Sequence, residues 1–472
     1  MSELPDTWTA ATLADVSYLN PGWDNALEDD TIISFVPMSA AEAGTGRLDV
    51  SATRSVREVK NGFTRFQDGD VLFAKITPSM ENGKVVVAWN LRGGFGAGTT
   101  EFHVVRTHGG ILSEYILYFL LQEGFRREAR MHMKGVAGQL RVPIEFLADA
   151  LLPLPPLPEQ HRIVAAIEEQ FTRLDVAVAA LKRVQANLKR YRASVLKAAC
   201  QGRLVPTEAE LARAEGREYE PASQPVAFGD AVLLDYKIPD GWMLKTIGEI
   251  TEIIIDCPHS TPEWTEMGKV CLRTTQFRPG RLDLSEVRYV SGETYARRIS
   301  RGKPKARDVL YSREGGILGI ACQVPVGVDL CLGQRMMLLR AGKQALPEYI
   351  MHLLNSPFIL ARVKSLTGGS ASPHLNVGDV KRFTVPLPSV VEQQRIVDEI
   401  ERLLSVAEEV EETVEQQLAH AERLRQAILK RAFEGKLVPQ DPNDEPAEKL
   451  LEQIRVERQA QTKFARMKSK RR

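Results

Sequence analysis

Two stretches of the chain carry apolar residues at alternating intervals of three and four positions, the spacing that places them on one face of a long helix. In the first stretch an apolar residue recurs every seventh position, at Ile167, Leu174, Leu181, Leu188 and Val195, and the alternate positions carry Val164, Phe171, Val178, Val184 and Tyr191. In the second stretch the apolar residues are Ile396, Ile400, Leu403, Val410, Val414, Ala421, Leu424 and Ile428. The pattern predicts two helices of about 40 residues, each about 60 Å long at roughly 1.5 Å per residue.

The two helical stretches are copies of one segment. Glu159-Gln160-His161-Arg162-Ile163-Val164 returns as Glu392-Gln393-Gln394-Arg395-Ile396-Val397, and Gly202-Arg203-Leu204-Val205-Pro206 returns as Gly435-Lys436-Leu437-Val438-Pro439. Both ends are displaced by 233 residues (392 − 159 and 435 − 202), so the length between them is fixed although the interior differs. A fixed length is typical of a spacer, and a long apolar stripe needs a partner. We expect the two copies to form an antiparallel coiled coil; the alternative is that each helix packs only on its own domain.

The segments that precede the helices also repeat, more weakly. Pro5-Asp6-Thr7-Trp8 corresponds to Pro239-Asp240-Gly241-Trp242, and Gly69-Asp70-Val71-Leu72-Phe73 corresponds to Arg307-Asp308-Val309-Leu310-Tyr311. Each segment mixes short β-like runs with one or two short helices, which indicates an α+β domain of ordinary size. The predicted order is a globular domain (1–152), a long helix (153–206), a linker (207–235), a second domain (236–385), a second helix (386–439) and a basic C-terminal tail (440–472).

This organisation resembles the specificity subunit of type I restriction–modification systems. The resemblance rests on a Pro-Leu-Pro run, Glu-Gln-x-Arg-Ile-Val, a helix of fixed length and Gly-Arg/Lys-Leu-Val-Pro, all present twice. It implies two target-recognition domains, each reading one half of a bipartite, asymmetric target in double-stranded DNA. It also implies a non-catalytic scaffold for host defence that docks two modification (methyltransferase) subunits and two restriction (motor–nuclease) subunits. S-adenosylmethionine would then belong to the methyltransferase, ATP and Mg to the restriction subunits, and no cofactor to this chain.

Composition adds few constraints. The chain has 472 residues, is 43% hydrophobic and carries a formal net charge of +1. It contains no signal peptide and no apolar run long enough to span a bilayer, so we expect a cytoplasmic protein without a membrane partner. Its five cysteines lack the paired spacing of metal ligands and fit a reducing compartment.

Catalytic motifs fail on inspection. Asn355-Ser356-Pro357-Phe358 departs from the Asn-Pro-Pro-Phe tetrapeptide of amino-methyltransferases at its second residue, and it interrupts a helical pattern. The glycine cluster Gly93–Gly98 lacks the preceding strand and following helix of a cofactor loop. Two other interpretations stay open. One is a coiled-coil protein-interaction scaffold without DNA binding, and the other is a fused enzyme, which the absent methyltransferase motifs disfavour.

Candidate DNA contacts lie in polar loops at the ends of predicted strands. Arg and Gln side chains can make bidentate contacts to base edges in the major groove, and Lys and Arg bind phosphates. The candidates are Lys75, Thr77, Lys84, Lys134, Gln139, Arg273, Thr275, Gln276, Arg278, Arg313, Ser370 and Ser372. The second domain also contains a basic run between Arg297 and Arg307, whereas the first domain is slightly acidic. Such a run is more often a solvated loop than a DNA contact when no other evidence accompanies it.

Overall fold

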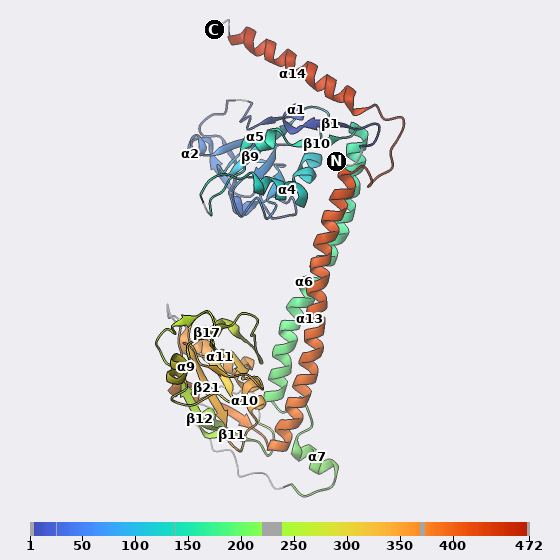
Figure 1. Ribbon diagram of the computed structural model, residues 1–472. Coiled ribbons are helices and arrows are strands. Elements are labelled where there is room, and N and C mark those ends of the chain that lie inside the picture. Colours follow the sequence, from blue (N-terminus) through green and yellow to red (C-terminus); the bar gives the residue numbers. More distant parts are fainter. Residues whose placement is uncertain (1–3, 25, 137, 220–237, 369–372, 470–472) are drawn as a thin grey trace. The chain divides into compact units, whose positions relative to one another are not determined.

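The computed structural model describes residues 4–24, 26–136, 138–219, 238–368 and 373–469 (Figure 1). Contacts divide the chain into two compact units. Unit 1 comprises Met1–Leu181 with Gln416–Arg472, and unit 2 comprises Lys182–Glu415. The two long helices, α6 (Leu157–Cys200) and α13 (Val390–Phe433), each contribute residues to both units. Each unit therefore contains one globular domain and parts of both helices.

The helices α6 and α13 are antiparallel, which confirms the predicted coiled coil. Asp175 forms an ion pair with Arg425 in unit 1, and Arg192 forms one with Glu411 at 2.7 Å in unit 2. Residue numbers thus rise along α6 as they fall along α13. Figure 1 shows the two helices side by side.

The predicted apolar seam is buried along most of α13 but incompletely along α6. The predicted seam residues of α13 that are buried are Ile396, Ile400, Val414, Ala421 and Ile428. By contrast, the predicted seam residues Val184, Tyr191, Val410 and Leu424 remain 38–42% exposed. A two-helix pair covers only a narrow stripe of each helix, so apolar residues at the flanks stay in solvent.

Domain 1 contains two four-stranded sheets, of order β2-β9-β6-β7 and β4-β3-β8-β5. The strands are β1 (Thr9–Thr12), β2 (Ser17–Leu19), β3 (Ile32–Val36), β4 (Thr53–Ser55), β5 (Thr64–Gln67), β6 (Val71–Ala74), β7 (Val85–Val87), β8 (Phe95–Gly98), β9 (Phe102–Thr107) and β10 (Leu151–Leu154). The helices are α1 (Leu13–Val16), α2 (Val56–Val59), α3 (Ser113–Leu120), α4 (Glu123–Met131) and α5 (Ile144–Ala148), with short 3₁₀ turns at Met38–Ala40 and Arg92–Gly94. Pairing is antiparallel except between β3 and β8.

Domain 2 repeats this plan, with sheets of order β12-β21-β18-β19 and β13-β17-β14-β20 and a small β15-β16 hairpin. Its strands are β11 (Met243–Thr246), β12 (Thr251–Asp256), β13 (Trp264–Thr265), β14 (Lys269–Cys271), β15 (Phe277–Arg278), β16 (Arg281–Leu282), β17 (Arg288–Val290), β18 (Val309–Ser312), β19 (Ala321–Gln323), β20 (Leu330–Cys331), β21 (Met336–Ala341) and β22 (Thr384–Leu387). Its helices are α8 (Ile247–Ile250), α9 (Gly292–Arg298), α10 (Pro347–Leu354), α11 (Pro357–Thr367) and α12 (Val377–Lys381). A 3₁₀ turn covers Thr274–Gln276, and the parallel pair is β14 with β20.

The first and last strands of each domain pair with each other. β1 is antiparallel to β10, and β11 is antiparallel to β22, where Thr246 lies opposite Thr384. The chain therefore enters and leaves each domain through one two-stranded ribbon, immediately before the long helix. Gln160 and Gln393 fix this junction in the same way, because each accepts a hydrogen bond from a backbone N–H of its domain, at 3.0 Å from Leu112 and 2.8 Å from Leu346. Each domain is thus an insertion on a repeated frame.

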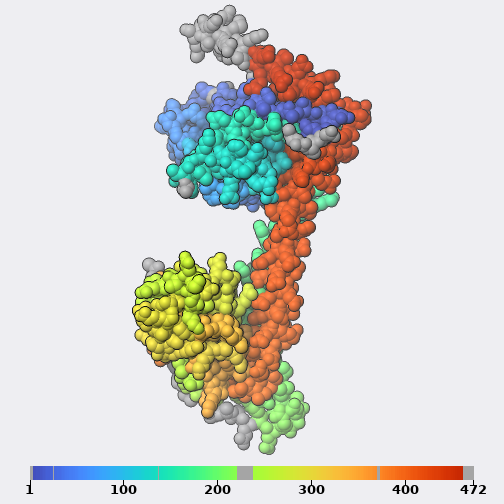
Figure 2. Space-filling model, viewed as in Figure 1, coloured from blue at the N-terminus to red at the C-terminus, as the bar shows by residue number. Residues whose placement is uncertain are grey.

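Two further helices follow the long ones, α7 (Glu208–Ala214) after α6 and α14 (Ala447–Ser469) after α13. The first part of α14 packs on domain 1, with Leu451 and Ile454 buried in its core. Arg458 donates a hydrogen bond to the carbonyl oxygen of Ala14 at 2.6 Å, at the short helix α1. The segment expected to be a basic tail therefore begins as a helix of unit 1, and Figure 2 shows it lying against the N-terminal residues.

Candidate nucleic-acid interface

Two of the candidate loops of domain 1 are joined by backbone hydrogen bonds. The Thr77 N–H donates to the Leu140 carbonyl at 3.0 Å, and the Val142 N–H donates to the Lys75 carbonyl at 2.9 Å. The loop after β6 and the loop before α5 therefore form one surface, although about 60 residues separate them in sequence. Lys134 and Gln139 lie on this surface and are exposed.

The other candidates of domain 1 have partners within the domain. The Thr77 hydroxyl donates to Glu81 at 2.7 Å, and the Lys84 ammonium donates to the Met38 carbonyl at 2.8 Å. Lys75 is half-buried, and this burial lowers the pKa of its ammonium despite the nearby Glu101 carboxylate. These three side chains shape the loop, whereas Lys134 and Gln139 project from it.

The corresponding loops of domain 2 also meet. The Leu375 N–H donates to the Arg313 carbonyl at 2.8 Å, and Glu314 pairs with His374 as an isolated β-bridge. Arg313 follows β18 as Lys75 follows β6, but its side chain is only 5% exposed. Its guanidinium forms ion pairs with Asp256 at 2.9 Å and with Glu314 at 3.0 Å. Arg313 therefore holds these loops together, and its charge is already balanced within the protein.

The loop after β14 divides into supporting and exposed residues. Gln276 is 4% exposed, and its side chain accepts from the Arg273 N–H at 2.8 Å and donates to the Glu286 carbonyl at 3.1 Å. The Arg273 guanidinium donates to the same carbonyl at 3.2 Å. Thr275 and Arg278 are exposed, the latter in an ion pair with Asp283 at 3.1 Å. Gln276 thus fixes the turn that presents Thr275. The remaining candidates, Ser370 and Ser372, lie outside the described residues.

Pairs of a cation and an aromatic ring recur on the second sheet of each domain, and no sequence motif predicts them. In domain 1, Arg54 lies 3.8 Å from the Phe35 ring centroid and Arg65 lies 4.9 Å from that of Trp23. In domain 2, Arg288 lies 5.4 Å from the Trp264 centroid. The partners are 19 to 42 residues apart in sequence (54 − 35, 65 − 23), so no local motif reveals them. A cation over a ring is worth roughly 0.5–1 kcal/mol at an exposed site.

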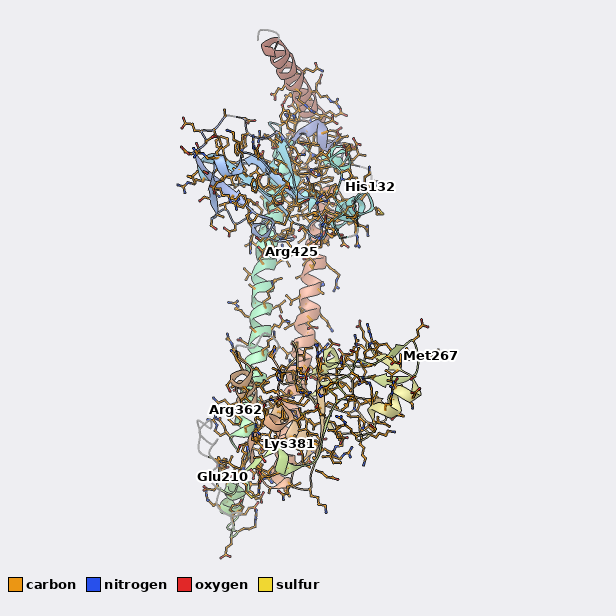
Figure 3. All side chains as sticks on the ribbon, turned by 90° about the vertical axis from the view of Figure 1, so that its left-hand side faces the viewer. His132, Glu210, Met267, Arg362, Lys381 and Arg425 are labelled. Atoms are coloured by element: carbon orange, nitrogen blue, oxygen red, sulfur yellow. The ribbon has the colours of Figure 1, made fainter. Side chains whose placement is uncertain are left out.

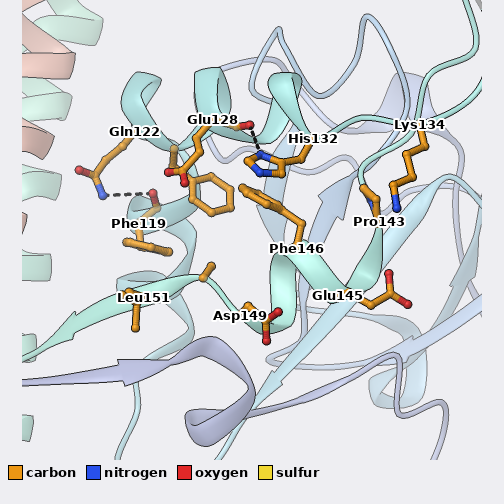
Figure 4. Close-up of a pocket in the computed structure, with 12 residues that line it drawn as sticks. Phe119, Gln122, Glu128, His132, Lys134, Pro143, Glu145, Phe146, Asp149 and Leu151 are labelled. Carbon is orange, nitrogen blue, oxygen red and sulfur yellow. Dashed lines mark hydrogen bonds between the residues drawn. The ribbon is translucent and has the colours of Figure 1, made fainter.

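Domain 1 also contains a cavity of about 690 Å³, between α4 and the segment that leads into β10 (Figure 4). His132 stacks on Phe146 with ring centroids 4.8 Å apart, and Lys134 lies at the rim. Glu128, Glu145 and Asp149 also line the cavity. The cavity thus borders the candidate interface, but its acidic lining disfavours binding of a phosphate there.

Asn355-Ser356-Pro357-Phe358 forms the junction between two helices. The Asn355 side chain donates to the Ala321 carbonyl at 2.8 Å and accepts from the Ala321 N–H at 3.0 Å. Ser356 caps α11, where its hydroxyl accepts from the Ile359 N–H at 3.4 Å. Among the described residues, no cluster of His, Cys, Asp or Glu could hold a metal ion, and no helix is long and apolar enough to cross a membrane.

Comparisons with known proteins agree with this architecture. Residues 239–420 match the family model of the type I restriction modification DNA specificity domain. The chain is 23% identical over 468 residues to the EcoAI specificity subunit of Escherichia coli, covering 85% of this chain and 78% of that protein. It is 28% identical over 377 residues to the EcoKI specificity subunit of Escherichia coli strain K12, covering 76% of this chain and 74% of that protein.

One solved structure superposes on this chain with a TM-score of 0.68. It belongs to work on the structural basis of complex assembly and conformational transition of the type I R-M system. The sequence identity is 19%, and the match covers 92% of this chain and all of the other. At this identity the likeness establishes the shared fold.

Proposed function

We propose that this chain, which belongs to the family of type I restriction–modification specificity subunits, binds a bipartite, asymmetric target in double-stranded DNA, one half-site per domain. The observation that carries the proposal is the repeat of one frame with two different loop sets. Lys134 and Gln139 occupy the exposed loop surface of domain 1, whereas Thr275 and Arg278 occupy that of domain 2 beside the half-buried Arg273. Different side chains on equivalent loops would read different bases.

The exposed candidates would contact DNA directly, and the buried ones would position them. Gln139 and Thr275 suit base-edge hydrogen bonds, and Lys134 and Arg278 suit phosphates. Gln276 and Arg313, which are already bonded within domain 2, would hold the loops in shape. Readout would then be spread over several contacts of about 1–3 kcal/mol each.

The long helices would fix the spacing of the half-sites and dock partner subunits. Apolar side chains on the helices remain in solvent, including Val176, which is 65% exposed, and Val406, which is 51% exposed. Such residues fit a partner helix better than water. Because the frame is repeated, two modification (methyltransferase) subunits would dock, and restriction subunits would join them in the cytoplasm. The partners would bring S-adenosylmethionine, ATP and Mg, while this chain would be non-catalytic.

The test is methyl transfer to DNA by this chain, by the methyltransferase subunit, and by their mixture. We expect sequence-specific adenine methylation only from the mixture. Methyl transfer by this chain alone would indicate a fused enzyme. A mixture that assembles but does not bind duplex DNA at any salt concentration would favour a protein-interaction scaffold without DNA binding.

A further inference from the structure

Charge is divided unequally between the two domains. Residues 1–152 contain 14 Lys and Arg against 19 Asp and Glu, whereas residues 236–385 contain 21 Lys and Arg against 14 Asp and Glu. A DNA duplex carries one negative charge per roughly 1.7 Å of its axis, so domain 1 as a whole would repel it and domain 2 would attract it.

Part of the positive excess of domain 2 lies on α9 and the segment that follows it. Arg297, Arg301, Lys303 and Lys305 are all exposed there, and we name them the α9 basic surface. Their neighbour Arg298 is 7% exposed and donates to the carbonyl oxygens of Leu332, Gly333 and Ser260 at 3.0, 3.2 and 2.6 Å. Arg298 therefore fixes α9 onto two loops and holds the basic surface in place.

A single carboxylate neutralises part of this surface. Asp329 forms ion pairs with Lys269 and Lys303, each at 2.8 Å, and accepts a hydrogen bond from the Tyr295 hydroxyl at 2.6 Å. The hydrogen bonds from both lysines hold the pKa of Asp329 well below its usual range. Because Asp329 already forms ion pairs with two lysines, it does not neutralise the other cations of the surface, Arg297, Arg301 and Lys305.

Two of those cations, Arg297 and Arg301, have neutral partners. Arg297 donates to the Thr294 hydroxyl at 3.2 Å, and Arg301 donates to the Asp256 carbonyl at 3.4 Å. For Arg297, Arg301 and Lys305, no carboxylate within the described ranges lies at ion-pair distance. Their charge is thus available to an external anion.

The equivalent helix of domain 1 shows the opposite arrangement. α2 follows β4 as α9 follows β17, and both strands flank the strand that makes the parallel pair of their sheet. At α2, Arg57 pairs with Asp30 at 2.8 Å and Lys60 pairs with Asp29 at 3.0 Å. The same position in the fold is therefore neutralised in domain 1 and positively charged in domain 2.

We infer that the α9 basic surface is a principal phosphate-binding surface of domain 2, and that domain 2 supplies most of the salt-dependent part of DNA binding. Domain 1 would contribute a smaller salt-dependent part, through Lys134, beside its contacts to bases. This inference rests on the proposed function. In Figure 1, α9 lies on the side of domain 2 remote from α13.

The experiment uses this chain assembled with its methyltransferase subunit and a DNA duplex that contains the sequence methylated by that complex. The dissociation constant of the complex for this duplex is measured at salt concentrations between 50 and 200 mM. The test variant is Arg297→Ala/Arg301→Ala/Lys305→Ala. Its matched control is Lys343→Ala/Lys364→Ala/Lys381→Ala, which removes the same charge from other exposed positions of domain 2. Figure 3 shows Lys381 and Met267 well apart from each other on domain 2.

The ratio of the dissociation constants at 200 and 50 mM salt measures the salt dependence. For the test variant we expect this ratio to be smaller than for the wild type, by about 3.5-fold for each lost phosphate contact and by up to about 40-fold for three. The preference for the correct half-site over a mutated one should stay the same, because phosphate contacts carry no sequence information. The control triple and the domain 1 variant Arg57→Ala/Lys60→Ala should keep the wild-type salt dependence.

Each alternative result overturns a distinct statement. A test variant with wild-type salt dependence would refute phosphate binding by the α9 basic surface but leave the proposed function intact. An equal change in the control triple shows that the net charge of domain 2, rather than this surface, is responsible. Loss of assembly with the methyltransferase in the test variant assigns the surface to protein contact. Absence of sequence-specific binding by the wild-type complex refutes the proposed function itself.

Discussion

The indole N–H of Trp242 donates a buried hydrogen bond of 2.7 Å to the carboxylate of Glu392. Trp8 and Glu159 make the same contact in unit 1, at 3.0 Å. Each tryptophan begins a globular domain, and each glutamate begins the long helix that follows that domain. One hydrogen bond therefore links the first and last parts of each half of the chain.

The same carboxylates also bind the segment that follows the opposite long helix. Glu159 accepts from the Gln440 side chain at 2.7 Å, and Glu392 accepts from the Glu208 N–H at 3.2 Å. Each carboxylate thus joins three pieces of the chain that are distant in sequence. The repeated Glu-Gln-x-Arg-Ile-Val and Gly-x-Leu-Val-Pro motifs mark the segments that meet there.

The two glutamates should make stability depend on pH in an unusual direction. Burial raises the pKa of both Glu159 and Glu392. A carboxyl whose pKa is raised on folding stabilises the fold fully below its unfolded pKa, and this contribution is lost as pH rises through the folded pKa. Relative to Glu159→Gln/Glu392→Gln, the wild-type protein should therefore gain stability as pH falls from 7.5 toward about 4.5.

Urea unfolding of both proteins at several pH values measures this difference. The exposed pair Glu409→Gln/Glu412→Gln serves as the control and should show no such gain. If the difference in the free energy of unfolding between the wild type and the buried double variant stays constant with pH, the raised pKa of Glu159 and Glu392 is contradicted.

The repeated buried ion pairs should be costly to break. Asp70 binds Arg106 and Asp308 binds Arg340, with a closest contact of 2.7 Å in each pair and side chains at most 17% exposed. Asp308→Ala leaves the Arg340 guanidinium without its partner, so we expect a loss of about 3–5 kcal/mol in the free energy of unfolding.

Arg307→Ala provides the comparison, because the Arg307 side chain is 57% exposed in its pair with Glu348. It should cost less than about 1 kcal/mol. Denaturant titration followed by tryptophan fluorescence gives both values, and equal losses would show that burial does not distinguish the two pairs.

The exposed and buried loop residues should have separable effects on DNA recognition. Thr275→Ala should weaken discrimination at the half-site of domain 2 only, by about 1–3 kcal/mol if a base contact is lost. Gln139→Ala should do the same at the half-site of domain 1. Gln276→Ala should lower stability as well as discrimination, since it removes two hydrogen bonds that hold the turn. Binding to targets mutated in one half at a time gives the readout, and equal losses at both halves would contradict modular recognition.

The sequence predicted the helices well because their signals are local. Apolar spacing and the repeated ends located α6 and α13. The burial of the seam was overestimated at Tyr191 and Val410, because heptad spacing does not reveal how wide a stripe the partner helix covers.

The loop residues were harder to assign from sequence, because polarity does not reveal burial. Gln276 and Arg313 look like ordinary exposed loop residues, yet tertiary contacts with Glu286 and Asp256 bury them. The pairing of Arg54 with Phe35 depends on how strands of the second sheet align, which no local pattern encodes.

Shortening both helices should shorten the target. Removing one heptad from the middle of each helix, Lys182–Leu188 and Thr413–Ala419, keeps the apolar spacing. It shortens the pair of α6 and α13 by about 10 Å. At roughly 3.4 Å per base pair along one strand, this is about three base pairs of spacer. Mapping the sites methylated by the assembled complex should show the same half-sites at closer spacing. Shortening one helix alone should abolish assembly, because facing residues of the two helices lose their register. Unchanged spacing in an active complex with both helices shortened would show that helix length does not set the distance between the half-sites.

The most direct test of one half-site per domain is exchange of a single domain. The ribbon of β11 and β22 allows residues 247–383 to be replaced by the equivalent segment of another specificity subunit without altering the frame. The measurement is the genome-wide map of adenines methylated by the complex before and after this exchange. One half-site should change while the other half-site and the spacing stay the same. Change in both half-sites, or in neither while methylation continues, would contradict recognition of one half-site per domain.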